Sequence, residues 1–392
     1  MPELQFKRIS VIGLGYIGLP TAAMFASRKV EVVGVDVSQN TVDTINRGET
    51  HIAEPDLDIV VRAVVREGYL RATTVPEPAE AFLIAVPTPF KGNNHDPDLG
   101  FIEMAARAIA PVLEPGDDAD IQVAHCPERV LPGKVMQELI TNDRVIGGMT
   151  LACSVRAAAL YRAFVTGECV IASSPRVAEM TKLTENSFRD VNIAFANELS
   201  LICDKLEMDV WELISLANRH PRVNILQPGP GVGGHCIAVD PWFIVSSAPE
   251  QAQLIRTARE VNDGKVNWVI GKVHAEIGAY LSANPAKTAT DVTLAIYGLA
   301  FKPDIDDLRE SPALAIALNL ATQHPGPLLI VEPNIERLPH GLENALMSDG
   351  SNISADVHVM LVDHQSFRKT ASPSGRLVDT RGVWSRTVEV SI

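Results

Sequence analysis

The feature that most constrains the fold is a glycine-rich turn near the amino terminus, placed between a strand pattern and a helix pattern. Residues 8–12 (RISVI) form an apolar run rich in β-branched residues, and GLGYIG follows at residues 13–18. The helical pattern LPTAAMFASR comes next, and a second strand pattern, VEVVGVD, ends at Asp36. This order predicts a complete βαβ unit of a parallel, doubly wound sheet.

Each residue of the turn has an expected role in holding a dinucleotide. Gly13 permits the tight turn, Gly15 lets the backbone approach a pyrophosphate at the helix amino terminus, and Gly18 allows close packing of helix on strand. Asp36 is placed to accept hydrogen bonds from the adenosine ribose, and its carboxylate repels a 2′-phosphate. The motif predicts NAD rather than NADP. A Rossmann-like fold that binds no dinucleotide is the alternative.

Other strand patterns extend this first unit. Residues 81–88 (AFLIAVPT) predict a buried strand that ends in a proline-rich turn, where ligands bind at the carboxyl edge of a parallel sheet. Shorter strands are expected at 121–125 (IQVAH) and 144–147 (RVIG).

The middle of the chain is predicted to be helical. Residues 176–205 are uninterrupted by glycine or proline and predict one long helix, a second helix is expected at about 251–280, and the polar stretch 283–291 predicts a linker. The apolar residues at helical spacing in the first helix are Val177, Met180, Leu183, Phe188, Val191, Phe195, Leu199 and Ile202. We interpret the helices as a central connector that also offers a dimer surface.

The carboxyl-terminal third repeats the order of the first. The strand TLAIYG (residues 293–298) leads to a loop and the helix PALAIALNLA, after which LLIVEP ends in Glu332 and VHVMLVDH parallels AFLIAVPT. We therefore predict an α/β protein with two Rossmann-like doubly wound domains joined by a central long-helix connector. The predicted division is an NAD-binding domain at 1–175, a central helical connector with a cysteine loop at 176–282, and a substrate-binding α/β domain at 283–392.

Length and charge limit the class of protein. A chain of 392 residues exceeds the usual size of a single domain, and it contains no apolar run of about 18 residues that would suggest a membrane span. Its amino terminus enters a strand without the apolar core of an export signal, so we expect a cytoplasmic protein without a membrane partner. The formal net charge of −14 disfavours nucleic-acid partners and requires local cations wherever an anionic substrate binds.

Five cysteines are scattered without a CxxC pair, so the sequence indicates neither a disulfide framework nor a metal site. One of them, Cys236, ends the glycine-rich segment GPGVGGHC at residues 229–236. Glycines leave room for a substrate, and loop amides stabilise a thiolate or an oxyanion. We interpret Cys236 as a candidate nucleophile. An inert buried cysteine in a structural turn is the alternative.

Two pairs of polar residues are further candidates. Lys182 and Asn186 lie four residues apart on the expected helix and so project from the same face, where a cation beside an amide donor can hold an oxyanion or a water. Lys302 and Arg309 belong to GLAFKPDIDDLRES, which in the second α/β unit holds the place of the glycine-rich turn. A solvated helix face and a balanced surface charge are the simpler interpretations of the two pairs.

The motifs run through nearly the whole chain and together resemble the UDP-glucose/UDP-mannosaminuronate dehydrogenase family. The segments that carry the resemblance are VIGLGYIGLPTAA, INRGETHIAEPDL, AVPTPFKG, CPERVLPG, LTENSFRDVNIAFANELS, NRHPRVNILQPGPGVGGHCIAVDPWF and GLAFKPDIDDLRESPA.

The resemblance implies an NAD-dependent, four-electron oxidation of UDP-N-acetyl-D-mannosamine to its uronate for bacterial surface polysaccharide such as enterobacterial common antigen. The implied enzyme is a homo-oligomer, with a dimer expected, that works through a cysteine thiohemiacetal and thioester and needs no metal. The same chemistry on UDP-glucose or UDP-N-acetylglucosamine is the alternative.

The resemblance also assigns roles to residues. The implied catalytic residues are the nucleophile Cys236, the oxyanion-stabilising Lys182 and Asn186, Asp240 for proton transfer or water positioning, and Glu128 for thioester hydrolysis. The implied cofactor-binding residues are Gly13, Gly15, Tyr16, Ile17, Gly18, Asp36, Pro87, Thr88 and Arg309. The implied substrate-binding residues are Arg129, Val130, Lys182, Arg189, His220, Gly233, Lys302 and Arg222, the last reaching the substrate from a neighbouring subunit in many relatives.

One segment departs from the family pattern. After Leu113 the family continues through a strand, a hydroxyl-rich loop and a helix, whereas here GDDAD leads directly into IQVAHCPERV. About thirty residues of the pattern have no counterpart, and because a doubly wound unit does not easily lose a strand and its crossover, we interpret the join as passing over an unobserved loop, with a real deletion as the alternative. A second shortening is expected around SDGSNISADV. The departure raises a rival of another class, a protein that binds NAD and a nucleotide sugar without turnover. Retention of Cys236, Lys182 and Asn186 argues against that rival.

Overall fold

The computed structural model describes residues 6–92, 95–113, 121–131, 133–234, 236–348, 350 and 353–384. The chain divides into two compact units, Met1–Thr184 and Glu185–Ile392, and the boundary falls inside one long helix, α7 (Pro175–Lys205). The finer division at residues 175 and 282 stays a prediction. Within the described residues, no helix is both long and apolar enough to cross a membrane.

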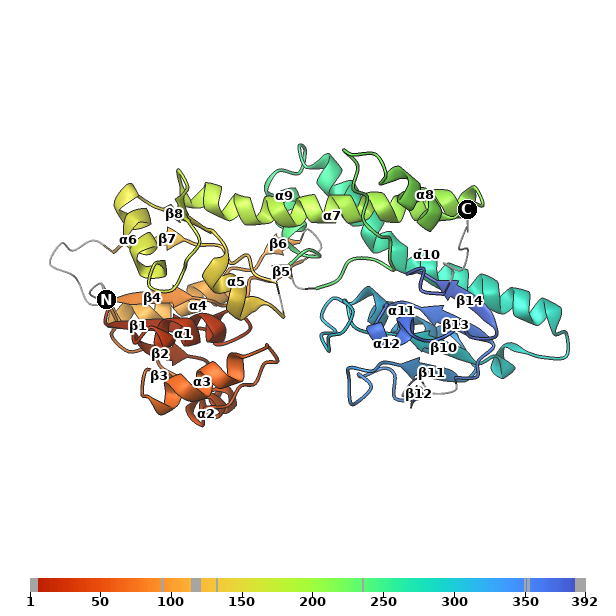
Figure 1. Ribbon diagram of the computed structural model, residues 1–392, viewed down its shortest axis with the longest axis horizontal. Coiled ribbons are helices and arrows are strands. Elements are labelled where there is room, and N and C mark those ends of the chain that lie inside the picture. Colours follow the sequence, from red (N-terminus) through yellow and green to blue (C-terminus); the bar gives the residue numbers. More distant parts are fainter. Residues whose placement is uncertain are drawn as a thin grey trace. The chain divides into compact units, whose positions relative to one another are not determined.

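The first unit is built on a four-stranded parallel sheet in the order β3-β2-β1-β4 (Figure 1). Its strands are β1 (Arg8–Ile12), β2 (Glu31–Val35), β3 (Leu70–Thr73) and β4 (Ala81–Ile84), so the predicted strand 81–88 ends four residues early. The helices between them are α1 (Gly18–Ser27), α2 (Gln39–Asn46) and α3 (Leu57–Arg66). Helix α1 buries nine of its ten residues, which explains why apolar and small residues surround it on all sides.

The remainder of the first unit forms two small sheets. One is a three-stranded sheet of β7 (Ala124–His125), β8 (Arg144–Gly148) and β9 (Cys169–Ile171), in which β7 runs antiparallel to β8. The strand expected at 121–125 is thus reduced to two residues. The other elements are β5 (Phe90–Lys91), β6 (Asp96–Pro97), α4 (Gly100–Ile109), the 3₁₀ turn Ala110–Val112, α5 (Val135–Thr141) and α6 (Leu151–Tyr161).

The second unit contains a five-stranded parallel sheet in the order β12-β11-β10-β13-β14, which confirms that the chain holds two Rossmann-like sheets (Figure 1). Its strands are β10 (Leu294–Tyr297), β11 (Leu328–Val331), β12 (Leu346–Ser348), β13 (Val357–Met360) and β14 (Arg376–Asp379). Its helices, besides most of α7, are α8 (Val210–Ala217), α9 (Asp240–Ser247), α10 (Gln253–Ala283), the 3₁₀ turn Ala289–Asp291, α11 (Pro312–Gln323) and α12 (Gln365–Arg368).

The long helix α7 confirms the helix predicted at residues 176–205. Five of the apolar residues at helical spacing are exposed: Val177, Met180, Phe188, Phe195 and Ile202. The residues it buries are mostly small or polar, namely Ala178, Ser187, Asp190, Ala194, Ala196, Asn197, Ser200 and Cys203. Most of the regularly spaced apolar residues therefore lie on the exposed face of α7, whereas small and polar residues form its buried face.

Hydrogen bonds join α7 to α10 across this buried polar face. Arg259 donates from Nη1 to Asp190 Oδ1 at 2.7 Å, and Asn262 Nδ2 donates to the same oxygen at 2.8 Å. Lys265 Nζ donates to Ser200 Oγ at 2.8 Å. A buried charge needs such partners, so the pairing fixes the register of the two helices.

Candidate active site

The glycine-rich turn of the first unit has the geometry expected of a dinucleotide cradle. Gly13 has φ +90°, and a Cβ on it would lie 2.6 Å from the Ala85 carbonyl oxygen. A Cβ on Gly18 would lie 1.7 Å from the carbonyl oxygen of Gly13, so only glycine fits there. A Cβ on Gly15 would meet nothing within 4 Å. Space is therefore open at the one glycine where a ligand must approach the backbone.

The amino terminus of α1 can receive an anion. Its N-cap, Ile17, provides no side-chain hydrogen bond, and no acidic residue lies in the first turn. The partial positive charge of the helix end is thus not balanced by the protein's own groups there. Tyr16 is exposed beside it. These features fit the pyrophosphate of NAD.

Asp36 lies immediately after β2, next to this turn. Its Oδ2 accepts a hydrogen bond from Leu14 N at 3.0 Å, and its Oδ1 accepts one from Ser38 N at 2.9 Å. The residue remains partly exposed, so its remaining lone pairs can accept from ribose hydroxyls. Pro87 and Thr88 follow β4, the other neighbour of β1, at the same carboxyl edge of the sheet.

Glu128 lies in the loop after β7 and is held by an arginine that the sequence did not single out. Glu128 Oε2 accepts from Arg144 Nη1 at 2.6 Å, and Arg144 is buried. Burial lowers the pKa of Arg144, but the charge and hydrogen bond of Glu128 outweigh it and leave the pKa raised. The pair fixes the orientation of the Glu128 carboxylate. Arg129 donates to Asp143 O at 3.2 Å, and Val130 packs on the core of the first unit.

The second unit brings three implied catalytic residues together. Cys236 is exposed, and its carbonyl oxygen accepts from Asp240 N at 2.8 Å. Asp240 is the first residue of α9, and its Oδ2 accepts from Asn186 Nδ2 at 2.7 Å. Hydrogen bonds therefore link helix α7, helix α9 and the backbone of the cysteine turn. The thiol, carboxylate and amide that these segments carry are a suitable set for covalent catalysis on a carbonyl.

The Cys236 loop (residues 229–234 and Cys236) lies against the loop of residues 298–311, which we call the Lys302 loop. Gly234 N donates to Arg309 O at 3.1 Å. A Cβ on Gly233 would lie 2.5 Å from Glu310 O and 2.7 Å from Phe301 Cβ, so this approach requires glycine. The structure thus brings Gly233, Lys302 and Arg309 to adjoining backbone segments.

The start of the Cys236 loop is anchored to the buried polar face of α7. Asn197 Oδ1 accepts from Gly229 N at 2.8 Å, and Asn197 Nδ2 donates to Asn262 Oδ1 at 2.8 Å. From the other side, Arg381 Nη1 donates to Pro228 O at 3.1 Å while its Nε donates to Asp363 Oδ1 at 2.7 Å. These anchors were missed because nothing in the sequence distinguishes Asn197 from a solvated asparagine.

The other predicted residues lie at several further places in the described structure. Lys182 lies one turn before Asn186 on α7. Burial lowers the pKa of His125 in the first unit; the charge of Glu179 opposes this shift, and the charge of Lys182 adds to it. Arg189 is exposed on α7, and His220 and Arg222 are exposed after α8. Arg309 pairs with Asp307, with Nη2 and Oδ2 2.6 Å apart. The shortened segment at residues 114–120 lies outside the described residues.

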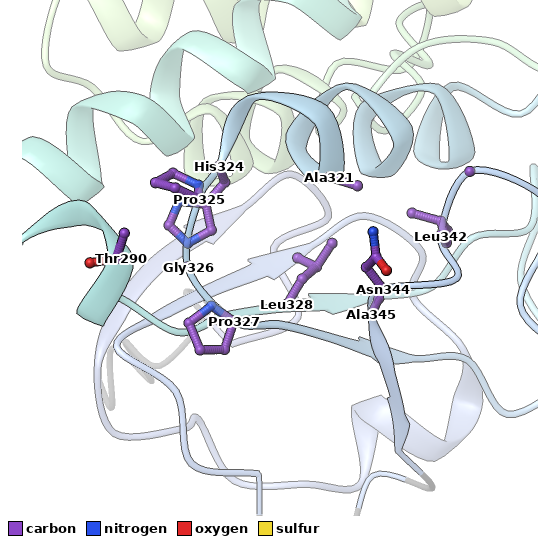
Figure 2. A pocket seen from close by; sticks show the side chains of 11 residues that line it. Thr290, Ala321, His324, Pro325, Gly326, Pro327, Leu328, Leu342, Asn344 and Ala345 are labelled. Carbon is purple, nitrogen blue, oxygen red and sulfur yellow. The ribbon is translucent and has the colours of Figure 1, made fainter.

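A cavity of about 470 Å³ lies elsewhere in the second unit (Figure 2). Thr290, His324, Leu328 and Asn344 are among its lining residues. Leu328 begins β11, so the cavity opens at the amino edge of the sheet, whereas doubly wound sheets bind ligands at the carboxyl edge. It is therefore separate from the Lys302 loop. Among the described residues, no cluster of histidine, cysteine or acidic side chains could hold a metal ion.

A dinucleotide cradle in one Rossmann-like unit and a cysteine–carboxylate–amide set in the other are features of a dinucleotide-dependent dehydrogenase. The chain belongs to the UDP-glucose/GDP-mannose dehydrogenase family. The family's NAD-binding domain matches residues 7–117 and 113–165, its central domain matches 176–264, and its UDP-binding domain matches 295–386.

Curated relatives match along their whole length. The UDP-N-acetyl-D-mannosamine dehydrogenases of Salmonella typhi and Escherichia coli are 58% and 57% identical, with 97% of this chain and 100% of each relative covered. The NDP-N-acetyl-D-galactosaminuronic acid dehydrogenase of Ralstonia nicotianae is 55% identical, with 98% and 97% covered. Among solved structures, the UDP-N-acetyl-mannosamine dehydrogenase of Staphylococcus aureus has a TM-score of 0.84 at 38% identity, with 96% and 95% covered.

The comparison also locates the shortening. The alignment with the Salmonella typhi relative spans 422 positions, whereas this chain has 392 residues, so at least 30 aligned positions have no counterpart here. The match to the NAD-binding domain breaks at residues 113–117, where the sequence pattern departs from the family. In the described sheet, β4 accordingly stands at the edge.

Proposed function

We propose that this protein is an NAD-dependent UDP-N-acetyl-D-mannosamine 6-dehydrogenase that oxidises the C6 alcohol to the carboxylate. The observation that carries the proposal is the hydrogen-bonded set of Cys236, Asp240 and Asn186 beside the Lys302 loop. The 57–58% identical relatives, which are named for this substrate, support the choice of sugar. The 55% identical relative named for a galactosaminuronic acid keeps that epimer as a second candidate.

NAD is held by the first unit in this proposal. The turn at Gly13 to Gly18 and the open amino terminus of α1 receive the pyrophosphate, and Asp36 receives the adenosine ribose. We propose that Arg309, Pro87 and Thr88 also contact NAD. Bound NAD supplies the hydride acceptor for both oxidations.

Cys236 carries the intermediate of the second oxidation. Its sulfur bonds to C6 of the aldehyde as the thiol proton leaves to a neighbouring base, and the former carbonyl oxygen takes up a proton to become the hydroxyl of the thiohemiacetal. Loss of a hydride and the hydroxyl proton leaves a thioester on Cys236. Water then cleaves the carbon–sulfur bond, which releases the carboxylic acid and restores the thiol.

The groups around Cys236 stabilise charge and move protons. Asn186 and Lys182 stabilise the oxyanions that develop at C6. Asp240 is oriented by the Asn186 amide and is suited to accept a proton or to position the water. Glu128, oriented by its ion pair with Arg144, acts in thioester hydrolysis.

The remaining contacts and the assembly complete the proposal. Lys302 and Gly233 bind the UDP-sugar together with the proposed substrate residues Arg129, Val130, Arg189, His220 and Arg222. A homodimer forms through the exposed apolar face of α7. The enzyme works in the cytoplasm and supplies a uronic acid for surface polysaccharide.

The test is NADH formation from a panel of UDP-sugars with protein whose intact mass matches this sequence, 42.3 kDa. The panel contains the UDP derivatives of N-acetylmannosamine, N-acetylgalactosamine, N-acetylglucosamine and glucose. The proposal predicts the highest kcat/KM for UDP-N-acetylmannosamine. Binding of NAD and UDP without NADH from any of the four sugars would instead support the silent binding protein.

A further inference from the structure

The two Rossmann-like sheets place an acidic residue at the same position. Asp36 directly follows β2, and Glu332 directly follows β11, the corresponding neighbour of the first strand. Both accept from the amide two residues beyond that first strand: Leu14 N in one case and Leu299 N, at 2.6 Å, in the other. In NAD-binding units this position recognises the ribose.

The two carboxylates differ in what remains available to a ligand. Asp36 stays partly exposed, whereas Glu332 is 1% exposed. Glu332 also accepts from Ala300 N at 3.2 Å and Asn334 N at 3.0 Å, and it pairs with His364 Nε2 at 3.2 Å. Burial alone would raise the pKa of Glu332, but the hydrogen bonds, led by that of His364, lower it. Glu332 is therefore satisfied by its own loop and closed to a ribose.

His364 continues this anchoring to the far end of the turn. Asp304 N donates to His364 Nδ1 at 2.9 Å, which requires Nδ1 to be the acceptor and leaves the Nε2 proton for Glu332. Asp304 has φ +61°, an uncommon conformation for a residue with a side chain, and its Oδ1 accepts from Gln365 N at 3.0 Å. Hydrogen bonds to Glu332 and His364 thus fix both ends of the segment 299–304.

Lys302 lies within the segment that these two residues hold. It is partly exposed and, among the described residues, makes no ion pair, whereas Arg309 of the same loop is paired with Asp307. A protein of net charge −14 needs local cations to bind a diphosphate. An ammonium on a fixed backbone binds an anion at a smaller entropy cost than one on a mobile loop.

We propose that Glu332 and His364 are positioning residues that hold the Lys302 loop in the conformation that binds the diphosphate of the UDP-sugar. The proposal rests on the proposed substrate role of Lys302. Glu332 thus holds the position that Asp36 holds in the first unit, but it anchors its own loop instead of binding a ribose.

The experiment measures UDP binding by titration calorimetry, with the full-length protein and no turnover. We expect Glu332→Gln and His364→Gln each to weaken UDP binding about tenfold, as for loss of one hydrogen bond to a charged group. His364→Gln removes the Nδ1 atom that accepts from Asp304 N. His364→Asn, which can retain an acceptor near the Nδ1 position, is expected to weaken UDP binding less. Glu336→Gln makes the same chemical change at an exposed site and serves as the control, with UDP affinity unchanged.

Three further measurements separate positioning from simple destabilisation. Asp304→Gly loosens the loop at an exposed residue and is expected to weaken UDP several-fold without affecting folding. In turnover, the variants should raise KM for the UDP-sugar and leave kcat and NAD affinity near parental values. Lys302→Ala should weaken UDP at least as much as they do.

The outcomes separate the two proposals. If Lys302→Ala loses UDP while Glu332→Gln, His364→Gln and Asp304→Gly bind it within about twofold of the parent, the positioning proposal is overturned alone. If Lys302→Ala binds UDP like the parent, the substrate role of the loop is also wrong. Parental UDP binding without NADH from any sugar would overturn the proposed reaction but not the positioning.

Discussion

At the scale of single residues, the sequence predicted the dinucleotide turn well because steric limits act locally there. Gly13 and Gly18 are required by contacts of 2.6 Å and 1.7 Å that any Cβ would make with neighbouring carbonyl oxygens. Asp36 was identifiable from its place after the second strand. By contrast, the partners of Glu128 and Asp240 come from other segments, so the ion pair with Arg144 could not be predicted from spacing.

Gly15→Ala separates ligand binding from folding. Its Cβ would meet no protein atom within 4 Å, so we expect the melting temperature to change little while NAD binds at least about tenfold more weakly, because the methyl group occupies the pyrophosphate's approach. NAD titration and thermal melting measure the two effects. Gly278→Ala, in open space on α10, is the control and should leave NAD affinity unchanged. Equal NAD affinity in the Gly15 variant would contradict this placement of the cofactor.

At the scale of secondary-structure elements, α7 shows what a hydrophobic period can and cannot predict. The period predicted a helix at residues 176–205, which the structure confirms, but it does not identify the groups on the buried face. In the structure the inner face hydrogen-bonds to α10 through Asp190, Asn197 and Ser200, and the apolar face points outward. A polar interface of this kind depends on partners some 65 to 72 residues away, which no local pattern contains.

Asn197→Ala tests whether the buried face of α7 supports the Cys236 loop. The substitution leaves Gly229 N and Asn262 Oδ1 without their partner, so we expect about 1–3 kcal/mol of destabilisation and a lower kcat. Melting curves and steady-state kinetics measure both, and the alkylation rate of Cys236, followed by peptide mass spectrometry, reports on the loop. Asn192→Ala removes an amide that donates to Phe188 O of its own helix and is the control. Matching alkylation rates and kcat in the two variants would show that Asn197 does not act on the loop.

Phe195→Glu tests the proposed dimer surface. Phe188, Phe195 and Ile202 are 70%, 55% and 42% exposed and recur every seven residues, which puts them on one face of α7. A carboxylate in the middle of an apolar face that the dimer would bury should weaken dimerisation at least about tenfold. Sedimentation velocity over a concentration series measures it, with the exposed Glu198→Gln as the control. An unchanged dimer, or a monomeric parent, would refute this surface.

At the scale of the whole molecule, the repeated βαβ order allowed both parallel sheets to be predicted, because each follows from local strand, turn and helix signals, whereas the strand orders come from the structure. The rest of the fold was harder to predict. The strand expected at 121–125 is only two residues long and antiparallel to β8. The family segment that would precede it is absent from this chain, so a pattern read from relatives does not apply there.

Lys265→Met tests a pH dependence of stability. Burial lowers the pKa of Lys265 to about 7, against the attraction of Asp204, whereas the unfolded chain has a pKa near 10.4. Between these values the unfolded state binds more protons, so this group makes stability rise with pH from about 7 to about 10. The advantage of the methionine variant in melting temperature should therefore be largest at or below pH 7 and shrink by pH 9. Exposed Lys205→Met is the control, and a pH-independent difference would contradict the buried amine.

The central claim is that one chain performs two oxidations of the same carbon with Cys236 holding the intermediate. The most direct measurement is the number of NADH formed per UDP-N-acetylmannosamine consumed, for the parent protein and for Cys236→Ser. The account predicts two NADH per sugar and a uronic acid product for the parent, with product formation lost in the variant while NAD and UDP still bind. One NADH per sugar, or two in both proteins, would contradict the covalent four-electron mechanism.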